Sequence, residues 1–263
     1  MLRTLVALAV LAALFAVVEW RWPANARVRR REGLGTDVGY WFVVSLVTKP
    51  LTQASIALAL VLLQRADLAT VRERLMHPTS WTGMQPLWLQ AIEMLVLGDV
   101  IGYVLHRTFH GRRLWRFHAV HHSSTELDWL SAVRVHPVNE WLPRLVTVVV
   151  LVSLGFSSLA IAAYVPALAL YAILLHANVR WSFGWIGHVI ASPLFHRWHH
   201  AAEEEALGKN FAGLFPWIDR LGGTYHLPPD RVPERFGVTG DPVPSGLWRQ
   251  LTYPLSTRSA GAT

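Results

Sequence analysis

HRWHH, residues 196–200, carries three histidines in the pattern His-x-x-His-His, and HAVHH, residues 118–122, carries the same pattern earlier in the chain. A third motif, HRTFH at residues 106–110, has two histidines four positions apart. On a helix, residues three and four positions apart share one face, so each motif can direct its imidazole rings to one place. A preference for the membrane surface sets the depth of a histidine but does not dictate a repeated spacing. The arrangement of two, three and three histidines therefore predicts a metal site.

The chain around these motifs has the composition of a membrane protein. Hydrophobic residues make up 52% of its 263 residues and charged residues only 16%, which is little charge for a soluble domain. A crossing of the bilayer needs about 20 mostly apolar residues. Four apolar stretches are candidates: Leu2–Trp20, Val38–Gln64, Pro86–Leu105 and Leu145–Leu175. The first is too long for a secretory signal and has no small-residue cleavage site before the arginines, so we expect it to stay as a helix.

The segment RWPANARVRRR, residues 21–31, has five arginines and no acidic residue. The positive-inside rule predicts that this loop is cytoplasmic. Counting two further crossings from it places His106 and the chain up to Arg144 on the cytoplasmic side. Lys49-Pro50 interrupts the second apolar stretch, which could be a re-entrant hairpin, and a miscounted crossing would invert this result.

The fourth apolar stretch has 31 residues, and one straight helix of that length would extend about 46 Å. That exceeds the hydrocarbon layer of about 30 Å, and a single crossing would separate the two histidine triplets. Gly155-Phe156-Ser157-Ser158 and Pro166 are plausible breaks. We therefore expect a helical hairpin, which returns His176 and His196 to the face that carries His118.

These features predict one all-α integral membrane domain over residues 1–263, in which membrane helices and a helical hairpin carry a cytoplasmic, histidine-rich helical cap. The C-terminal part is rich in proline, glycine and charge, as in a loop or an extended tail. The expected parts are membrane helices at 1–105, a first histidine-rich cap segment at 106–143, the membrane hairpin at 144–180, a second histidine-rich cap segment at 181–226 and a polar tail at 227–263.

Cysteine is absent, which excludes disulfides, thiolate metal sites and cysteine nucleophiles. Eight or more imidazoles exceed the four ligands of a structural zinc site, so the motifs imply two metal ions. Neutral imidazole suits zinc, copper, iron and nickel alike, and the ligand type alone does not choose among them. The net charge of +7 comes almost wholly from arginine. In a membrane protein such charge suits anionic lipid, and we expect no nucleic-acid partner.

In this order, with membrane spans before and between them, HRTFH, HAVHH, HANVR at 176–180 and HRWHH resemble the fatty acid hydroxylase superfamily, also called the sterol desaturase family. The likeness runs from about Glu93 to Tyr225 and includes RVHP at 134–137, KNFAG at 209–213 and DRLGGTY at 219–225. Members of that family are membrane di-iron enzymes that use dioxygen to hydroxylate or desaturate lipids. The resemblance implies two iron ions, with dioxygen as co-substrate, where the residues alone leave zinc possible.

The resemblance also implies a set of metal ligands: His106, His110, His118, His121, His122, His196, His199 and His200, with His176 as a further one. His136, before Pro137, is either another ligand or a turn residue at the membrane surface. Some relatives have a second histidine four positions after the one that matches His176, where this chain has Arg180, and Gly222 stands where the last motif often has an aromatic residue.

One acidic residue joins the candidate site from the third apolar stretch. Asp99 shares a helix face with His106 and His110 at helical spacing, so it can orient a ligand imidazole by a hydrogen bond from behind. A carboxylate within a membrane span is usually functional, although a plain interhelical hydrogen bond is the alternative. No catalytic residue beyond the metal centre is expected, and we assign no chemistry to His77, His188 or His226.

The function implied is hydroxylation or desaturation of a lipid, such as a fatty acyl, sterol or isoprenoid lipid, in a bacterial inner membrane. The chain has no cysteine for an iron–sulfur centre and no flavin or nicotinamide motif, so a separate ferredoxin or b-type cytochrome with its reductase must supply electrons. Two alternatives remain: a zinc-dependent membrane hydrolase or lyase, and a metal-binding membrane protein without catalysis. A transporter would hold its ligands at the membrane midplane, whereas these motifs lie in predicted loops.

Overall fold

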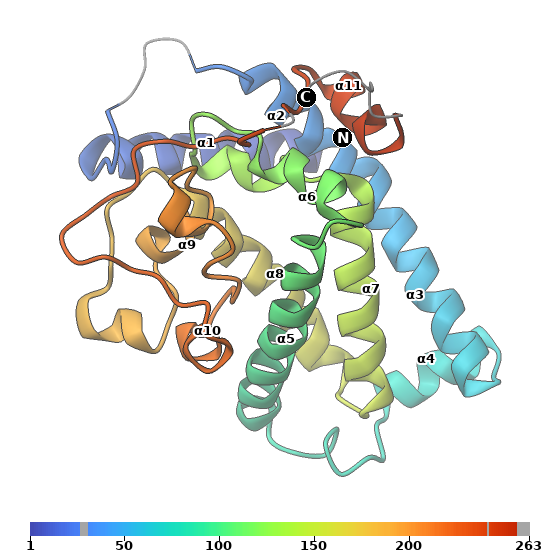
Figure 1. Cartoon of the computed structure of the whole chain (residues 1–263). Coiled ribbons are helices and arrows are strands. Elements are labelled where there is room, and N and C mark those ends of the chain that lie inside the picture. The colour runs from blue at the N-terminus through green and yellow to red at the C-terminus, as the bar shows by residue number, and fades with distance from the viewer. Residues whose placement is uncertain (27–30, 241, 257–263) are drawn as a thin grey trace.

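The computed structural model describes residues 1–26, 31–240 and 242–256, and this part of the chain is all-helical with no β-strand, which confirms the predicted fold class (Figure 1). Residues 27–30 of the arginine-rich loop and 241 and 257–263 of the tail lie outside the described residues. The α-helices are α1 Leu2–Arg21, α2 Leu34–Val43, α3 Lys49–Gln64, α4 Leu68–Met76, α5 Leu87–Phe109, α6 Trp115–His122, α7 Pro137–Ser153, α8 Ser158–His176, α9 Pro193–His199, α10 Pro216–Gly222 and α11 Leu247–Thr252.

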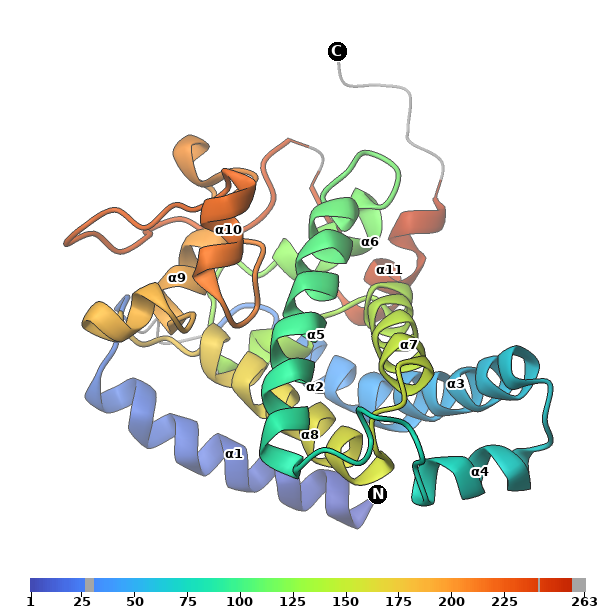
Figure 2. The same cartoon turned by 90° about the horizontal axis from the view of Figure 1, so that it is seen from below.

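In the described part of the chain, four helical segments are long and apolar enough to cross a membrane: α1, the continuous run Leu34–Gln64, α5 and α8. Their outer residues are exposed apolar side chains such as Leu14, Leu62 and Leu170, as expected for surfaces that face lipid. Figure 2 shows α6, α9 and α10 gathered around the C-terminal end of α5. The short helices therefore form a cap at one end of the membrane helices.

The second apolar stretch does not form a re-entrant hairpin. Residues Val44–Thr48 form a π-helical turn that joins α2 directly to α3, and Pro50 lies in the first turn of α3. Proline lacks an N–H and its ring crowds the carbonyl four residues earlier. The wider π turn takes up this disturbance without ending the helix.

The fourth apolar stretch is a helical hairpin, as predicted. Helices α7 and α8 are joined by a turn that contains Gly155, at φ +86°, and the Ser157 hydroxyl caps α8 by accepting the Ala160 N–H. A Cβ at position 155 would lie 2.4 Å from the Ser80 side chain, so the turn requires glycine there. The second expected break does not form, because Pro166 lies inside the uninterrupted α8.

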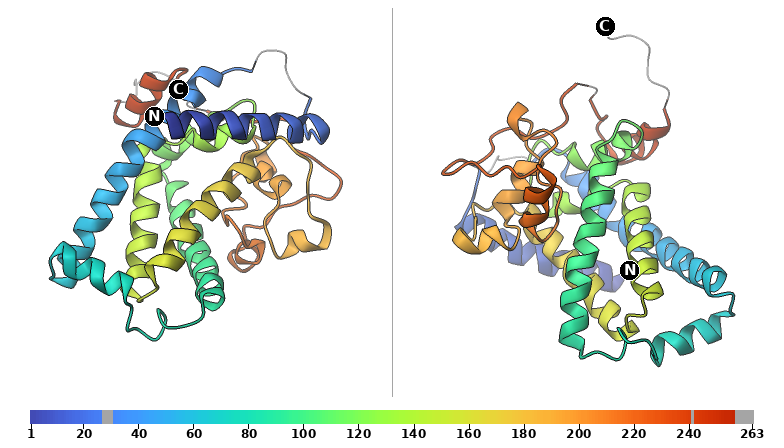
Figure 3. Two further views of the ribbon diagram at one scale, coloured as in Figure 1. Left: turned by 180° about the vertical axis from the view of Figure 1, so that it is seen from behind. Right: turned by 60° about the horizontal axis from the view of Figure 1, so that its bottom comes forward.

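Helix α1 lies on the outside of the molecule (Figure 3), yet its C-terminal half is tied to the cap. The buried carboxylate of Glu19 accepts the backbone N–H groups of Trp129 and Asn178, each at 3.0 Å. Phe15 stacks on Trp129 with ring centroids 5.5 Å apart. The segment Trp129–Val133, a 3₁₀ helix that follows the first histidine triplet, is thereby fixed against the membrane helices.

Candidate metal centre

Nine histidines converge at the cap end of α5 and α8, in two groups. Within each group, one ring nitrogen per residue lies within 4.8 Å of all the others. The first group has five members: His106, His110, His118, His122 and His199. The second has four members: His121, His176, His196 and His200. The rings of His122 and His200, one from each group, stack at a centroid distance of 4.4 Å, so the groups are neighbours.

Each His-x-x-His-His motif contributes to both groups. The first and last histidines of HAVHH, four apart on α6, enter the five-histidine group, while His121 enters the other. HRWHH does the reverse, since His196 and His200 enter the four-histidine group and His199 enters the five-histidine group. The repeated pattern therefore links two adjacent sites, each triplet giving two rings to one and one ring to the other.

Local sequence explains where these helices begin. The Ser192 hydroxyl caps α9 by accepting the Phe195 N–H, and Pro193 occupies its first turn, where its missing N–H does no harm. Helix α9 then consists of buried residues throughout. The turn around Gly111, after α5, reverses the chain into α6. The pair on α5 and the triplet on α6 thus face each other.

The separations of the Nε2 atoms match a coordination polyhedron. Neighbouring Nε2 atoms lie 3.0–3.2 Å apart in the pairs His106–His118, His118–His122, His121–His176, His176–His196 and His196–His200. Two imidazoles bound to one ion at about 2.1 Å and at roughly 90–100° to each other would be separated by about 3.0–3.2 Å. The rings are therefore spaced like ligands of shared ions.

The backs of the rings are held by hydrogen bonds that leave Nε2 free. Nδ1 lies 2.7–3.1 Å from a protein oxygen in five cases: His106 to Phe211 O, His118 to Asn139 Oδ1, His121 to Arg134 O, His176 to Ala172 O and His199 to Lys209 O. These oxygens can only accept, so Nδ1 carries the hydrogen and the Nε2 lone pair points into the centre. This is the tautomer that a metal ion requires.

Burial also keeps the cap histidines neutral. It is the largest cause that lowers the pKa of His118, His121, His122, His196, His199 and His200 well below the usual value, with neighbouring rings adding to it. Within the two histidine groups, the buried Nε2 atoms of His110 and His199 have no hydrogen-bond partner among the described residues. Unpartnered nitrogens and facing lone pairs are costly in a dry interior. The donor set therefore fits two metal ions.

A loop that follows the second triplet supports His106. Asp99 accepts the backbone N–H groups of Gly213, Leu214 and Phe215 at 2.6–3.0 Å. The fully buried Asp219 accepts the N–H groups of Phe211 and Ala212, both at 2.8 Å. Asp99 thus contacts the loop rather than an imidazole, and the same loop carries Phe211, whose carbonyl accepts from His106. Sequence analysis assigned no role to Asp219, although it noted the motif DRLGGTY that contains this residue.

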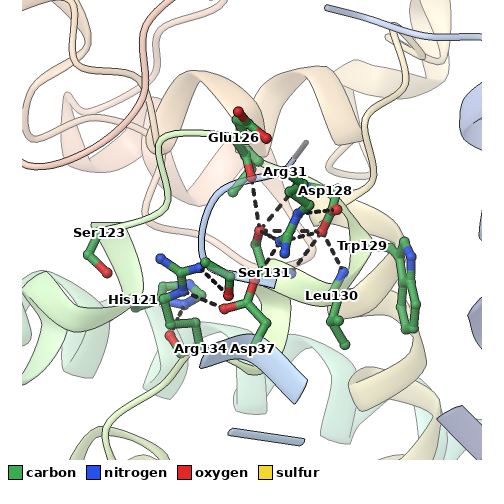
Figure 4. Close-up of polar contacts among 12 residues, drawn as sticks. Arg31, Asp37, His121, Ser123, Glu126, Asp128, Trp129, Leu130, Ser131 and Arg134 are labelled. Atoms are coloured by element: carbon green, nitrogen blue, oxygen red, sulfur yellow. Dashed lines mark hydrogen bonds and ion pairs between the residues drawn. The ribbon is translucent and has the colours of Figure 1, made fainter. Parts of the chain in front are cut away.

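A buried ion-pair network supports His121 (Figure 4). The Arg134 carbonyl accepts from His121, and the Arg134 side chain pairs with Asp37 of α2, which is fully buried. Arg31 also pairs with Asp37 and donates to Asp128 at 2.8 Å. Sequence analysis missed this network. Its signals were the carboxylate of Asp37, directly before the second apolar stretch, and the arginine of RVHP.

The remaining histidines lie apart from the two groups. His136 is the N-cap of α7, where Nδ1 accepts the Val138 N–H at 3.2 Å and Nε2 lies 3.1 Å from the Leu251 carbonyl oxygen. Both of its ring nitrogens are therefore engaged away from the centre. Arg180 is exposed, so the position where some relatives have a histidine points away as well.

A cavity of about 380 Å³ opens beside the histidines, between α5, α7 and α8. Rings from both groups line it, including His106, His118 and His176. Most of its wall comes from apolar side chains such as Val148, Leu168 and Leu175. The two histidine groups thus face a space large enough for part of an apolar ligand.

The fold and the centre define a class: a helical membrane protein with two adjacent all-histidine sites able to bind metal ions. Residues 91–224 match the fatty acid hydroxylase family. Ornithine lipid hydroxylase OlsE of Rhizobium tropici is 30% identical over 251 residues, which cover 94% of this chain and 73% of that protein. The chain therefore belongs to the fatty acid hydroxylase family and is an oxidoreductase of this type, as the resemblance implied.

More distant relatives belong to the same family. The alkylglycerol monooxygenase of Danio rerio is 27% identical over 66% of this chain and 38% of that protein, and the human one is 26% identical over 54% and 32%. The chain thus spans about a third of the length of these monooxygenases. No solved structure matches the chain.

Proposed function

We propose that this protein is a di-iron hydroxylase that acts on a membrane lipid. The observation that carries the proposal is the convergence of nine imidazoles, seven of them buried, in two neighbouring groups beside a mostly apolar cavity. The five-histidine group would hold one iron ion and the four-histidine group the other. Imidazole is also a zinc ligand, and family membership favours iron here.

The two ions would supply the reductive activation of dioxygen, which no amino-acid side chain provides. The overall change joins a lipid C–H, dioxygen, two electrons and two protons to give the hydroxylated lipid and water. Desaturation consumes the same reagents and removes a second hydrogen in place of adding oxygen. The electrons would come from a separate ferredoxin or b-type cytochrome with its reductase.

The chain's own residues would position the lipid and keep the site dry. Apolar walls from α5, α7 and α8 line the approach to the histidines, and exclusion of water suppresses side reactions of an oxidising centre. The hydrogen bonds behind His106, His118 and His121 fix their rings before a metal ion arrives, which limits reorganisation during turnover.

The relatives narrow the expected substrate to amphiphilic lipids. One relative is named for ornithine lipid and others for alkylglycerols, and both kinds of molecule join a polar head to apolar hydrocarbon. We therefore favour a polar lipid over a sterol or an isoprenoid. The arginine-rich segment after α1 supports a cytoplasmic position of the centre at a bacterial inner membrane.

The test is metal analysis of the purified protein combined with lipid profiling of cells that contain or lack it. We expect about two iron ions per chain and a lipid species heavier by one oxygen, labelled when the cells grow under ¹⁸O₂. Two zinc ions and turnover without dioxygen would instead identify a hydrolase or lyase. Bound metal with no change in any lipid would favour a protein without catalysis.

A further inference from the structure

The charged residues that line the cavity beside the histidines lie on α5 and α7. The carboxylate of Asp99, on α5, already accepts three backbone N–H groups. The face of α7 that lines the cavity consists of Asn139, Glu140, Pro143, Arg144, Thr147 and Val148. Asn139 binds the back of His118 at 2.8 Å, and Glu140 follows it directly in the chain. The charged part of the cavity therefore adjoins the histidine centre.

Glu140 and Arg144 form an ion pair across one helical turn, with side chains only 20% and 27% exposed, respectively. An ordinary surface pair at this spacing stabilises a helix by about 0.3–0.5 kcal/mol and has no reason to face a cavity. In residues 1–26, 31–240 and 242–256, neither side chain has another hydrogen-bond or ion-pair partner. A carboxylate and a guanidinium with spare hydrogen-bonding capacity thus stand side by side in the wall.

Away from the histidines, the lining is uncharged. A second cavity of about 450 Å³ lies between α5 and α8 and shares Leu95 and Tyr164 with the first. It has no charged residue in its lining, which includes Trp88, Met94 and Ala163. From Trp88 to His106 the α5 helix rises about 27 Å, close to the thickness of the hydrocarbon layer, about 30 Å. The lining of the two adjoining cavities thus changes from charged near the histidines to apolar away from them.

We propose that Glu140 and Arg144 bind the head of a zwitterionic lipid, one with both an ammonium and a carboxylate group, so that the head lies next to the histidine centre and the acyl chain extends between α5 and α8. Glu140 would accept from the ammonium, and Arg144 would donate to the carboxylate in two parallel hydrogen bonds. The oxidised carbon would then lie in or near the head rather than at the end of the chain. This inference rests on the proposed function for its reaction, whereas the binding site stands on the cavity alone.

Three synthetic probes test the site on the full-length protein in detergent. N-palmitoylornithine carries both charges, N-palmitoylnorvaline lacks the ammonium, and N-palmitoylputrescine lacks the carboxylate. We expect the protein to bind the first at least about tenfold more tightly than either of the others, because each lost charge removes a charge-assisted hydrogen bond. Equal affinity for all three probes would overturn the proposal, and this comparison needs no variant.

Two single substitutions test which residue binds the ammonium and which binds the carboxylate of the lipid head. Glu140→Gln should abolish the preference for N-palmitoylornithine over N-palmitoylnorvaline, and Arg144→Gln should abolish its preference over N-palmitoylputrescine. Arg72→Gln, on the exposed surface of α4, should leave both preferences unchanged. If either cavity variant kept the full preference, its residue would not bind the head.

Metal content and turnover separate this inference from the proposed function. Selective binding of N-palmitoylornithine without iron or hydroxylation would leave the head site standing and refute the di-iron hydroxylase. Iron together with hydroxylation of a lipid, but without discrimination among the probes, would refute the head site alone. Hydroxylation of N-palmitoylornithine at the far end of its acyl chain would overturn the proposed orientation.

Discussion

Nδ1 of His121 lies 3.1 Å from the backbone carbonyl oxygen of Arg134, and the side chain of the same arginine pairs with Asp37 in the first turn of α2. The position of a ring in the four-histidine group therefore depends on an ion pair with a membrane helix. Both partners are buried, at 0% exposure for Asp37 and 5% for Arg134. A buried charge that loses its partner is strongly destabilising.

Replacement of Arg134 by methionine should destabilise the protein and loosen the metal centre. Among the described residues, the Asp37 carboxylate would keep Arg31 alone as a charged partner, and we expect a loss on the order of 3 kcal/mol, the low end for a broken buried pair. Metal affinity should fall about 10–100-fold, as for other residues that orient a ligand from behind. Thermal unfolding in detergent and iron content measure the two effects.

Arg134→Lys is the matched control, because it keeps the positive charge but cannot donate from Nε to Asp37 and also reach the Gly33 carbonyl. We expect it to recover part of the stability. A methionine variant with unchanged unfolding temperature and full iron content would show that the network does not support His121.

Loss of a single imidazole should prevent the binding of one metal ion but leave the protein folded. His121→Ala takes one of the four rings from its group, and His199→Ala takes one of the five from the other. Both should lower product formation by at least about 100-fold, more than the loss of an outer residue, while the protein stays in the membrane. His77→Ala is the control, since that ring is exposed on the surface. If the His121 or the His199 variant still formed product, these histidines would not be ligands of the metal ions.

The convergence of the histidines could be predicted because their spacing and order are local features of the sequence. The hairpin of α7 and α8 could also be predicted, since one helix of that length would separate the two triplets. The positions at which this apolar stretch is interrupted were harder to predict. Gly155 ends a helix because its φ is positive, whereas Pro166 is tolerated within α8.

Other parts of the site could not be predicted because they depend on segments that meet only in the folded chain. Asp37 and Arg134 are 97 positions apart, and Asp99 reaches Gly213 across 114 positions. The absence of an aromatic residue at Gly222 has a similar origin, since a Cβ there would lie 1.9 Å from the hydroxyl oxygen of Tyr103. A residue of α5 thus occupies the space that a larger side chain would need.

Asp99→Asn should weaken turnover more than it weakens iron binding. The carboxylate accepts three backbone N–H groups, and an amide replaces one acceptor oxygen by a donor. The loop would shift and carry the Phe211 carbonyl away from His106, which we expect to lower kcat about tenfold. Glu93→Gln, on the same helix, is the control because Glu93 contacts Gln85 and not this loop. Equal activity of the two variants would show that Asp99 has no positioning role.

Gly98→Ala should disturb the junction of the two cavities through Tyr164. An added Cβ would lie 1.8 Å from the Tyr164 hydroxyl oxygen, and this tyrosine lines both cavities. The ring must move, so we expect a destabilisation of about 1–3 kcal/mol, typical of overpacking, and a changed preference for acyl-chain length.

Tyr164→Phe removes the closest of these contacts, and in the double variant it should recover part of the loss, because residues in contact are coupled. The recovery will be incomplete, since the ring carbon that bears the hydroxyl would still lie 2.8 Å from the new methyl group. Gly102→Ala, one turn along α5, has no atom within 4 Å of its added Cβ and should be stable. The measurements are the unfolding temperatures of the variants and the competition among lipids of different chain length. Strictly additive effects of the two substitutions would show that Gly98 and Tyr164 do not act on each other.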